Sequence, residues 1–387
     1  MGVYMTAWVA GTPTLRNKVI SLFDTKAVNA VVIDIKDATG RVAYEPLDPQ
    51  LKALGISDHR IKDLPVLIAE LHKRGIYVIG RVASFQDPFM VKLHPDWAVK
   101  RANGVDNWKD HKGISWIDVS AKPMWDYLAA IGKDAYAQGF DEINYDYVRF
   151  PSDGNMQDIS FPWTEKQPAG SRTKPEALKT FFVFLWHTFT GNQTDPGVRS
   201  AQYFALSQAA ASTTLDSASS TPGEIASSSL AALPPVPQIS ESALVRPIIS
   251  VDLFGLTTTA QNDLGIGQVL ANALPYVDYV CPMVYPSHFG AGWNGYPNPD
   301  AVPYQVISES MESAAEVADT HGISPDKLRP WLQDFSLGVI YTPALVEDQI
   351  RAADELGLSW LMWNASNHYT AAALPNKPGP SVASAAR

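Results

Sequence analysis

The stretch QGFDEINYDYV, residues 138–148, contains the end of one predicted element and the whole of the next. A helical pattern over residues 121–138 runs into Gly139, and glycine is the residue type that most often ends a helix in the left-handed conformation. Residues 141–148 then form a short run rich in apolar and aromatic side chains, which predicts a strand. The order helix, glycine, strand is typical of parallel α/β proteins.

The same order recurs along the chain, with a glycine one residue before Ile76 and again before Leu358. The predicted strands are 3–9, 30–36, 76–83, 141–148, 248–255, 277–285, 330–336 and 358–364. The predicted helices are 13–25, 62–74, 121–138, 174–189, 262–274, 304–321 and 343–356. Eight strands alternating with helices predict an α/β fold, a (β/α)8 or TIM barrel in one domain. An open doubly wound sheet is the alternative, but no glycine-rich phosphate loop follows the first strand.

The predicted barrel spans residues 1–373 and is interrupted once. Residues 191–245 are dominated by Ala, Ser, Thr, Pro and Gln, which predicts a disordered low-complexity insertion. The insertion falls between the fourth helix and the fifth strand, on the N-terminal face of the barrel. Residues 374–387 have a similar composition and are predicted to form a flexible tail.

Composition excludes several classes of partner and cofactor. The 387 residues carry a formal net charge of −10, without the basic surplus that duplex nucleic acid or an anionic membrane requires. One cysteine, Cys281, excludes a disulfide framework, and the eight histidines form no metal-binding pair, so neither a metal nor another cofactor is expected. No apolar run reaches the ~20 residues of a membrane span, and the first residues lack the features of a signal peptide. No pattern predicts an oligomeric state.

Two aspartates are the leading candidates for chemistry, because barrel enzymes place reacting groups at the C-terminal ends of their strands. Asn144 and Asp146 share one face of the fourth strand, and Asp146 lies near its end with Arg149 close behind. Asp252 occupies a similar place on the fifth strand. Strands about 4.8 Å apart would bring these carboxylates into the range of a glycosidase acid pair. The alternatives are structural: Asp146 paired with Arg149 or Arg81, and Asp252 bonded to a nearby loop.

The candidates for binding a substrate are polar or aromatic side chains at strand ends, which suit the edges and faces of sugars: Asp34, Lys36, Arg81, Asn144, Arg149, Tyr285, His288, Gln333, Trp363 and Asn364. Asp34 and Lys36 are expected on one face, as a buried pair that orients a ligand. Gln333 and Asp334 must face opposite ways, and we expect Gln333 in the barrel mouth and Asp334 against a helix.

Several motifs resemble those of a glycosyl hydrolase-like barrel family catalogued as a bacterial domain of unknown function. The matching segments are YMTAW at 4–8, NAVVIDIKD at 29–37 followed by Gly40, GFDEINYDYVRFP at 139–151, SVDLFG at 250–255, CPMVYP at 281–286 and PWLQDF at 330–335. The likeness covers residues 3 to 370 apart from the insertion. It implies a (β/α)8 barrel related to glycosidases, with Asp146 as the leading catalytic candidate and a bacterial, secreted or envelope context.

Residues 283–285 also resemble a strand of chitinase-type barrels, but the fourth strand lacks their closing glutamate, and Arg149 stands near that point. Substrate-assisted chitinase chemistry is therefore not expected. The sequence favours a glycoside hydrolase acting on a polysaccharide or glycan, with Asp146 as nucleophile or base and Asp252 as acid. One alternative is a non-catalytic carbohydrate-binding or cell-surface barrel. Another is an aldolase or lyase, for which Lys36 is the strand-borne lysine.

Overall fold

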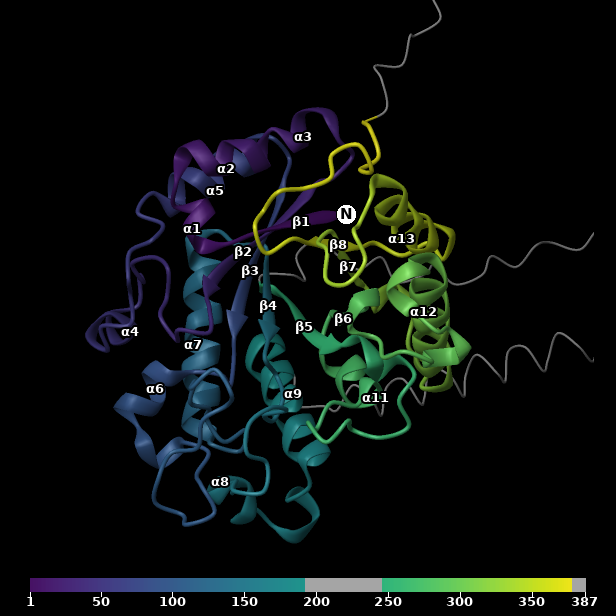
Figure 1. The fold of residues 1–387 in the computed structure, drawn as a ribbon. Coiled ribbons are helices and arrows are strands. Elements are labelled where there is room, and N and C mark those ends of the chain that lie inside the picture. Colours follow the sequence, from purple (N-terminus) through teal and green to yellow (C-terminus); the bar gives the residue numbers. More distant parts are fainter. Residues whose placement is uncertain (192–245, 378–387) are drawn as a thin grey trace, which may run out of the picture.

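The computed structural model describes residues 1–191 and 246–377, which form a closed barrel of eight parallel strands paired in sequence order (Figure 1). The strands are β1 (Gly2–Met5), β2 (Ala30–Lys36), β3 (Tyr77–Ala83), β4 (Glu142–Asp146), β5 (Ile248–Phe254), β6 (Tyr279–Met283), β7 (Trp331–Gln333) and β8 (Leu361–Trp363). The predicted (β/α)8 barrel is confirmed. The insertion predicted at 191–245 and the last ten residues of the predicted tail lie outside the described residues, apart from Gly191.

Helices surround the barrel and cover the outer face of the sheet (Figure 1). They are α1 (Ala7–Ala10), α2 (Pro13–Ile20), α3 (Leu22–Thr25), α4 (Pro49–Ala53), α5 (Leu64–Lys73), α6 (Pro88–Leu93), α7 (Lys122–Gln138), α8 (Pro162–Glu165), α9 (Lys174–Thr190), α11 (Leu270–Ala273), α12 (Pro303–Thr320) and α13 (Pro343–Glu355). None of these described helices is long and apolar enough to cross a bilayer.

Two predicted elements differ from the structure. The strand predicted to run to residue 9 ends at Met5, because the Thr6 hydroxyl accepts the Val9 backbone N–H and caps α1. The helix predicted over 262–274 is reduced to α11, since Leu264, Gly265 and Gly267 have positive φ angles, which an α-helix does not tolerate.

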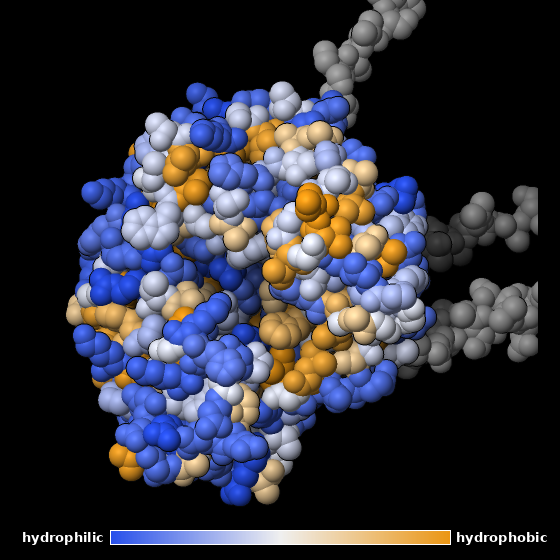
Figure 2. Space-filling model, viewed as in Figure 1, coloured by the Kyte–Doolittle hydropathy of each residue, from blue (hydrophilic) through white to orange (hydrophobic). Residues whose placement is uncertain are grey.

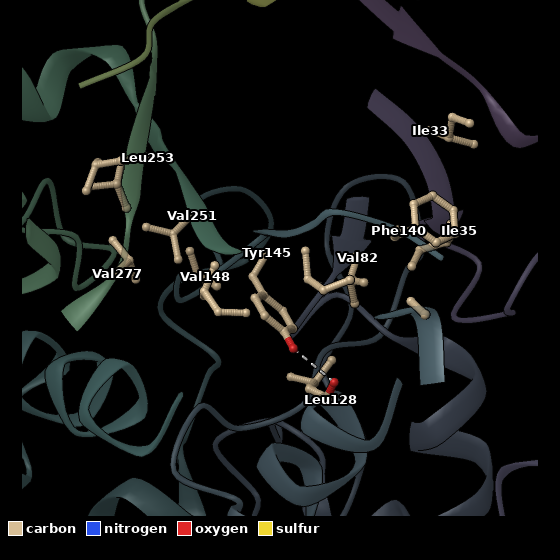
Figure 3. Close-up of a cluster of buried hydrophobic side chains, with 14 of the residues drawn as sticks. Ile33, Ile35, Val82, Leu128, Phe140, Tyr145, Val148, Val251, Leu253 and Val277 are labelled. Carbon is tan, nitrogen blue, oxygen red and sulfur yellow. Dashed lines mark hydrogen bonds between the residues drawn. The ribbon is translucent and has the colours of Figure 1, made fainter. Parts of the chain in front are cut away.

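Strand residues alternate between the two sides of the barrel wall, and each side has its own core. Val31, Ile33 and Val251 face outwards and pack against the helices, whereas Val32 and Ile79 face the barrel interior. Figure 3 shows part of the outer core, where the Tyr145 hydroxyl donates to the Leu128 carbonyl of α7 at 3.2 Å. Gly132 leaves room for that ring, because a Cβ there would lie 2.4 Å from the Tyr145 hydroxyl.

The first residues of the predicted tail are bound to the barrel. Leu374 is buried, the Pro375 carbonyl accepts the Ala27 N–H at 2.8 Å, and the Lys377 N–H donates to the Thr25 carbonyl at 2.9 Å. Of the tail predicted from residue 374, residues 375–377 thus contact residues 25–27 at the end of α3, and the flexibility of the tail stays a prediction.

Candidate active site

The predicted catalytic residues meet in a cavity of about 200 Å³ at the C-terminal ends of the strands. Its lining residues come from the ends of six strands and the loops that follow them: Arg81, Asp146, Tyr147, Arg149, Asp252, Phe254, Met283, Tyr285, His288, Trp331 and Trp363. The molecule is hollowed near the centre of the face viewed in Figure 2. This is the end of a (β/α)8 barrel at which active sites are built.

Arg81 of β3 joins three buried carboxylates. Its Nη1 donates to Asp34 Oδ1 at 2.6 Å, its Nε donates to Asp146 Oδ2 at 3.1 Å, and Nη2 also bonds that oxygen. The Nε atom lies 3.8 Å from Asp252 Oδ2. One nitrogen near both aspartates limits the separation of their Oδ2 atoms to at most about 7 Å, the sum of those two distances. The guanidinium of Arg81 therefore lies within ion-pair distance of three carboxyl groups.

Asp252 is buried, and the hydrogen-bond donors that contact its carboxyl group lie on one oxygen. Its Oδ1 accepts hydrogen bonds from Asn144 Nδ2 at 2.9 Å and from Trp331 Nε1 at 2.7 Å. Burial, and next the negative charge of Asp146, raise the pKa of Asp252 to about 8. Because both N–H donors occupy Oδ1, the proton belongs on Oδ2, the oxygen that faces Arg81.

Both carboxyl oxygens of Asp146 accept hydrogen bonds. Two N–H groups of Arg81 bond its Oδ2, and the Tyr147 backbone N–H bonds its Oδ1. Tyr147 has a φ of 52°, an uncommon conformation for an aromatic residue that turns the chain directly after β4. This turn brings the backbone N–H of Tyr147 to the Asp146 side chain and its ring to the cavity wall.

Asp34 lies behind the cavity with a partner that the sequence did not reveal. The Tyr4 hydroxyl of β1 donates to Asp34 Oδ2, while the Tyr4 ring stacks on Trp363 at 3.9 Å between centroids. Burial raises the pKa of Asp34, and the positive charge of Arg81 opposes this rise. The signal available in the sequence was the alternation of β1, which turns Tyr4 inwards between the outward-facing Val3 and Met5.

Arg149 lines the cavity but does not pair with Asp146; of the two arginines predicted as alternative partners of Asp146, Arg81 forms the pair. Its Nη1 donates to the Phe150 carbonyl at 3.2 Å and to Ser152 Oγ at 3.0 Å. Its guanidinium lies 4.8 Å from the centre of the Trp116 ring and 4.9 Å from that of Phe254.

Lys36 does not reach the cavity, and the predicted pair with Asp34 does not form. Its side chain is fully buried, 2.9 Å from Asp87 Oδ2, and it donates to the Ala83 carbonyl. The register of β2 against β3 shifts between Asp34 and Lys36, so alternation no longer places these residues on one face. A lysine enclosed in this way is not available to form an imine, which removes the basis for the lyase alternative.

The Gln333 side chain is likewise hydrogen-bonded within the protein. Its Oε1 accepts from the Ser287 N–H at 3.1 Å and hydroxyl at 2.9 Å, and its Nε2 donates to the Phe335 carbonyl. The loop after β6 thus covers Gln333 and takes the hydrogen bonds that we expected a sugar to make. Asp334 does not lie against a helix: it accepts from the Thr370 N–H and hydroxyl at 2.7 Å each.

Asn364 belongs to a different cavity from the two aspartates. Its Nδ2 bonds the Asp334 and His368 carbonyls, and its Oδ1 accepts from the Ser366 N–H. These residues line a polar cavity of about 410 Å³ beside the ends of β7 and β8. Of the other predicted binding residues, Trp363 and Tyr285 line the main cavity, and Asn144 lies behind Asp252. Within the described ranges, no three His, Cys, Asp or Glu side chains are grouped to hold a metal ion.

Comparisons with known proteins agree with this architecture. A family model described as "Putative glycosyl hydrolase domain" matches residues 2–198 and 234–369. The glycoside hydrolase domain of PgaB (BpsB) from Bordetella bronchiseptica has a similar fold, with a TM-score of 0.56 and 12% identity over 95% of this chain and 94% of that one. A hypothetical protein from Ruminiclostridium thermocellum is 33% identical over 47% of this chain and 90% of its own, with a TM-score of 0.42. No curated protein matches the chain significantly.

The likeness to PgaB supports the barrel fold, which the strand order shows independently. Family membership rests on the family model, whose two matched segments cover most of the sequence, including every strand of the barrel. The chain therefore belongs to the family described as "Putative glycosyl hydrolase domain".

Proposed function

We propose that this protein is a glycoside hydrolase that cleaves a glycan with Asp146 as nucleophile and Asp252 as general acid. The observation that carries the proposal is the unequal state of two carboxyl groups in one cavity. Asp252 has a pKa raised to about 8, whereas Asp146 is bonded by two N–H groups of a guanidinium. A protonated acid beside an ionised carboxylate is the pair that glycoside hydrolysis requires.

In the first step, the Asp252 Oδ2 proton passes to the glycosidic oxygen, and Asp146 attacks the anomeric carbon as the bond to the leaving group breaks. In the second step, Asp252 takes a proton from water, which displaces Asp146 and releases the sugar. The upper limit of about 7 Å on the Oδ2 separation favours this retaining route, because inverting enzymes hold their carboxyl groups about 6.5–9.5 Å apart.

The other residues of the cavity have supporting roles in this proposal. Arg81 keeps Asp146 charged and oriented, while Asn144 and Trp331 fix Oδ1 of Asp252 so that Oδ2 carries the proton. Trp363 and Tyr285 offer aromatic surfaces to the apolar face of a sugar ring.

The test is a panel of polysaccharides incubated with the purified protein, with new reducing ends measured. The variants are Asp146→Asn, Asp252→Asn and, as a matched control, Asp87→Asn, which removes the charge of a buried aspartate outside the cavity. We expect turnover by the wild type and by folded Asp87→Asn, and loss of turnover in the two site variants.

Two outcomes would contradict the proposal. If Asp146→Asn and Asp252→Asn released reducing ends as fast as the wild type, the chemistry would lie elsewhere. If no glycan were cleaved but one bound the wild type and Asp146→Asn equally, the protein would be a carbohydrate-binding barrel.

A further inference from the structure

A second cavity opens directly beside the proposed catalytic cavity and differs from it in chemistry. It has a volume of about 390 Å³ and shares Phe254, Met283, Tyr285 and His288 with the catalytic cavity. Its remaining walls are apolar and include Leu256 and Phe289. Figure 2 shows hydrophobic residues gathered along one side of the central hollow, on the side where β5 and β6 lie in Figure 1.

The position of this apolar cavity is set by two neighbouring strands. Phe254 and Met283 are register partners at the ends of β5 and β6, and Asp252 lies two residues before Phe254 on the same face of β5. Gly255 allows the chain to turn tightly here, because a Cβ would lie 2.4 Å from the Met283 carbonyl oxygen. The apolar cavity therefore adjoins the catalytic cavity at the ends of β5 and β6, whereas Asp146 ends β4, the strand on the other side of β5.

The lining has little to offer to a hydroxyl-rich ligand. The polar side chains on its walls are those of Tyr285 and His288, and no described residue hydrogen bonds to either side chain. Burial lowers the pKa of His288, so the ring is neutral at neutral pH and places no charge in the cavity. Apolar walls with a few polar groups are typical of sites that bind small organic ligands.

We infer that this cavity is part of the leaving-group subsite and that it accepts an alkyl or aryl aglycone. The inference rests on the proposed function, in which Asp252 protonates the oxygen of the leaving group, and on the apolar cavity adjoining the catalytic cavity that Asp252 lines. An apolar aglycone would bury its carbon atoms against Phe254, Leu256 and Phe289.

The first experiment compares methyl, butyl and octyl glycosides of the sugar that the polysaccharide screen identifies. Their leaving alcohols have similar acidities, so differences in kcat/KM report contacts of the aglycone. Burial of three added methylenes predicts a kcat/KM at least about tenfold higher for butyl than for methyl. Leu256→Gln should remove most of this preference and leave hydrolysis of the methyl glycoside unchanged. Leu256 lines only the apolar cavity and is partly exposed, so this substitution spares the catalytic residues.

The second experiment measures binding without turnover. The neutral probe N-phenyl-1-naphthylamine should fluoresce on binding to the wild type and to Asp146→Asn, be displaced by octanol, and bind at least about fivefold more weakly to Leu256→Gln. Equal kcat/KM for the three glycosides, or probe binding unaffected by Leu256→Gln, would overturn the inference and leave a glycosidase in place. Probe binding without hydrolysis of any glycan would instead overturn the proposed function, and with it the role of the cavity as a leaving-group subsite.

Discussion

The two ends of the barrel interior each hold a buried arginine among acidic groups, but the balance of charge differs. At the C-terminal end, Arg81 faces the three carboxyl groups of Asp34, Asp146 and Asp252. At the N-terminal end, Arg329 faces Glu142 alone, with Nη1 at 3.1 Å from Oε2 and Nη2 bonded to Oε1. The first cluster opens on a cavity, whereas the second lies in the closed bottom of the barrel.

We interpret this difference as one between the proposed catalytic site and a structural ion pair. In the pair of Glu142 and Arg329, one positive charge meets one negative charge. An excess of carboxyl groups around one arginine keeps one of them protonated, and burial together with Asp146 raises the pKa of Asp252 to about 8. In our proposal, this raised pKa lets Asp252 act as the general acid.

The largest effect is expected at the unbalanced end. Asp146→Asn should lower kcat by at least about 10³-fold, because the amide cannot attack the anomeric carbon. The melting temperature should change little, since the substitution removes one negative charge from a cluster that has too many. Reducing-end release and differential scanning calorimetry measure the two quantities. A loss of activity that follows the loss of folded protein would show Asp146 to be structural.

The balanced end should respond in the opposite way. Arg329→Met leaves Glu142 buried without its ion-pair partner and should lower the free energy of unfolding by about 3–5 kcal/mol, with kcat per folded molecule unchanged. The double variant Glu142→Gln/Arg329→Met should recover at least half of this loss, because no unpaired charge remains. Urea denaturation checks both values. A fall in kcat for the folded double variant would break the distinction between the two ends.

The pH dependence should carry the signature of Asp252. As the general acid it must be protonated, so kcat/KM should fall as the pH rises through about 8, and the control is an unchanged pH profile in Leu256→Gln.

The stability of the fold should also depend on pH through Asp252, because the folded state retains a proton on Asp252 that the unfolded chain releases near pH 4. Stability from this group therefore decreases between about pH 4 and 8, by up to about 1.4 kcal/mol per unit, and is constant above 8. Asp252→Asn should remove this contribution in urea titrations. A stability that rises over that window by the same amount would contradict the assignment.

The sequence predicted most of the fold and the centre of the site because both depend on periodicity. Apolar strands separated by helices predicted the barrel, and alternation along β4 and β5 turned Asp146 and Asp252 inwards. Alternation failed where the backbone leaves the regular register. The register of β2 shifts between Asp34 and Lys36, and Lys36 pairs with Asp87. The left-handed turn at Tyr147 comes two residues before Arg149, which packs against aromatic rings.

Several contacts between different strands and loops were not predicted from the sequence. The hydrogen bond from Trp331 to Asp252 joins β7 to β5, and the one from Tyr4 to Asp34 joins β1 to β2. Ser287, which donates a hydrogen bond to the Gln333 side chain, lies in the irregular loop after β6. Such pairs depend on the curvature of the closed sheet and on loop paths, which leave no periodic pattern in the chain.

The smallest effect tests whether the unbalanced cluster extends as far as Tyr4. Tyr4→Phe removes the hydrogen bond to Asp34 and keeps the ring that stacks on Trp363, so kcat should fall about three- to tenfold and stability by about 1 kcal/mol. The matched control is Tyr369→Phe, which removes a buried hydroxyl bonded to the Tyr4 backbone. We expect a similar loss of stability in the control with kcat unchanged, because Tyr369 has no contact with Asp34 or Arg81 among the described hydrogen bonds. Equal losses of kcat in the two variants would mean that the rate responds to a general loosening of β1. A loss of kcat confined to Tyr4→Phe would instead place Tyr4 among the contacts that position Arg81 and, through Arg81, Asp146.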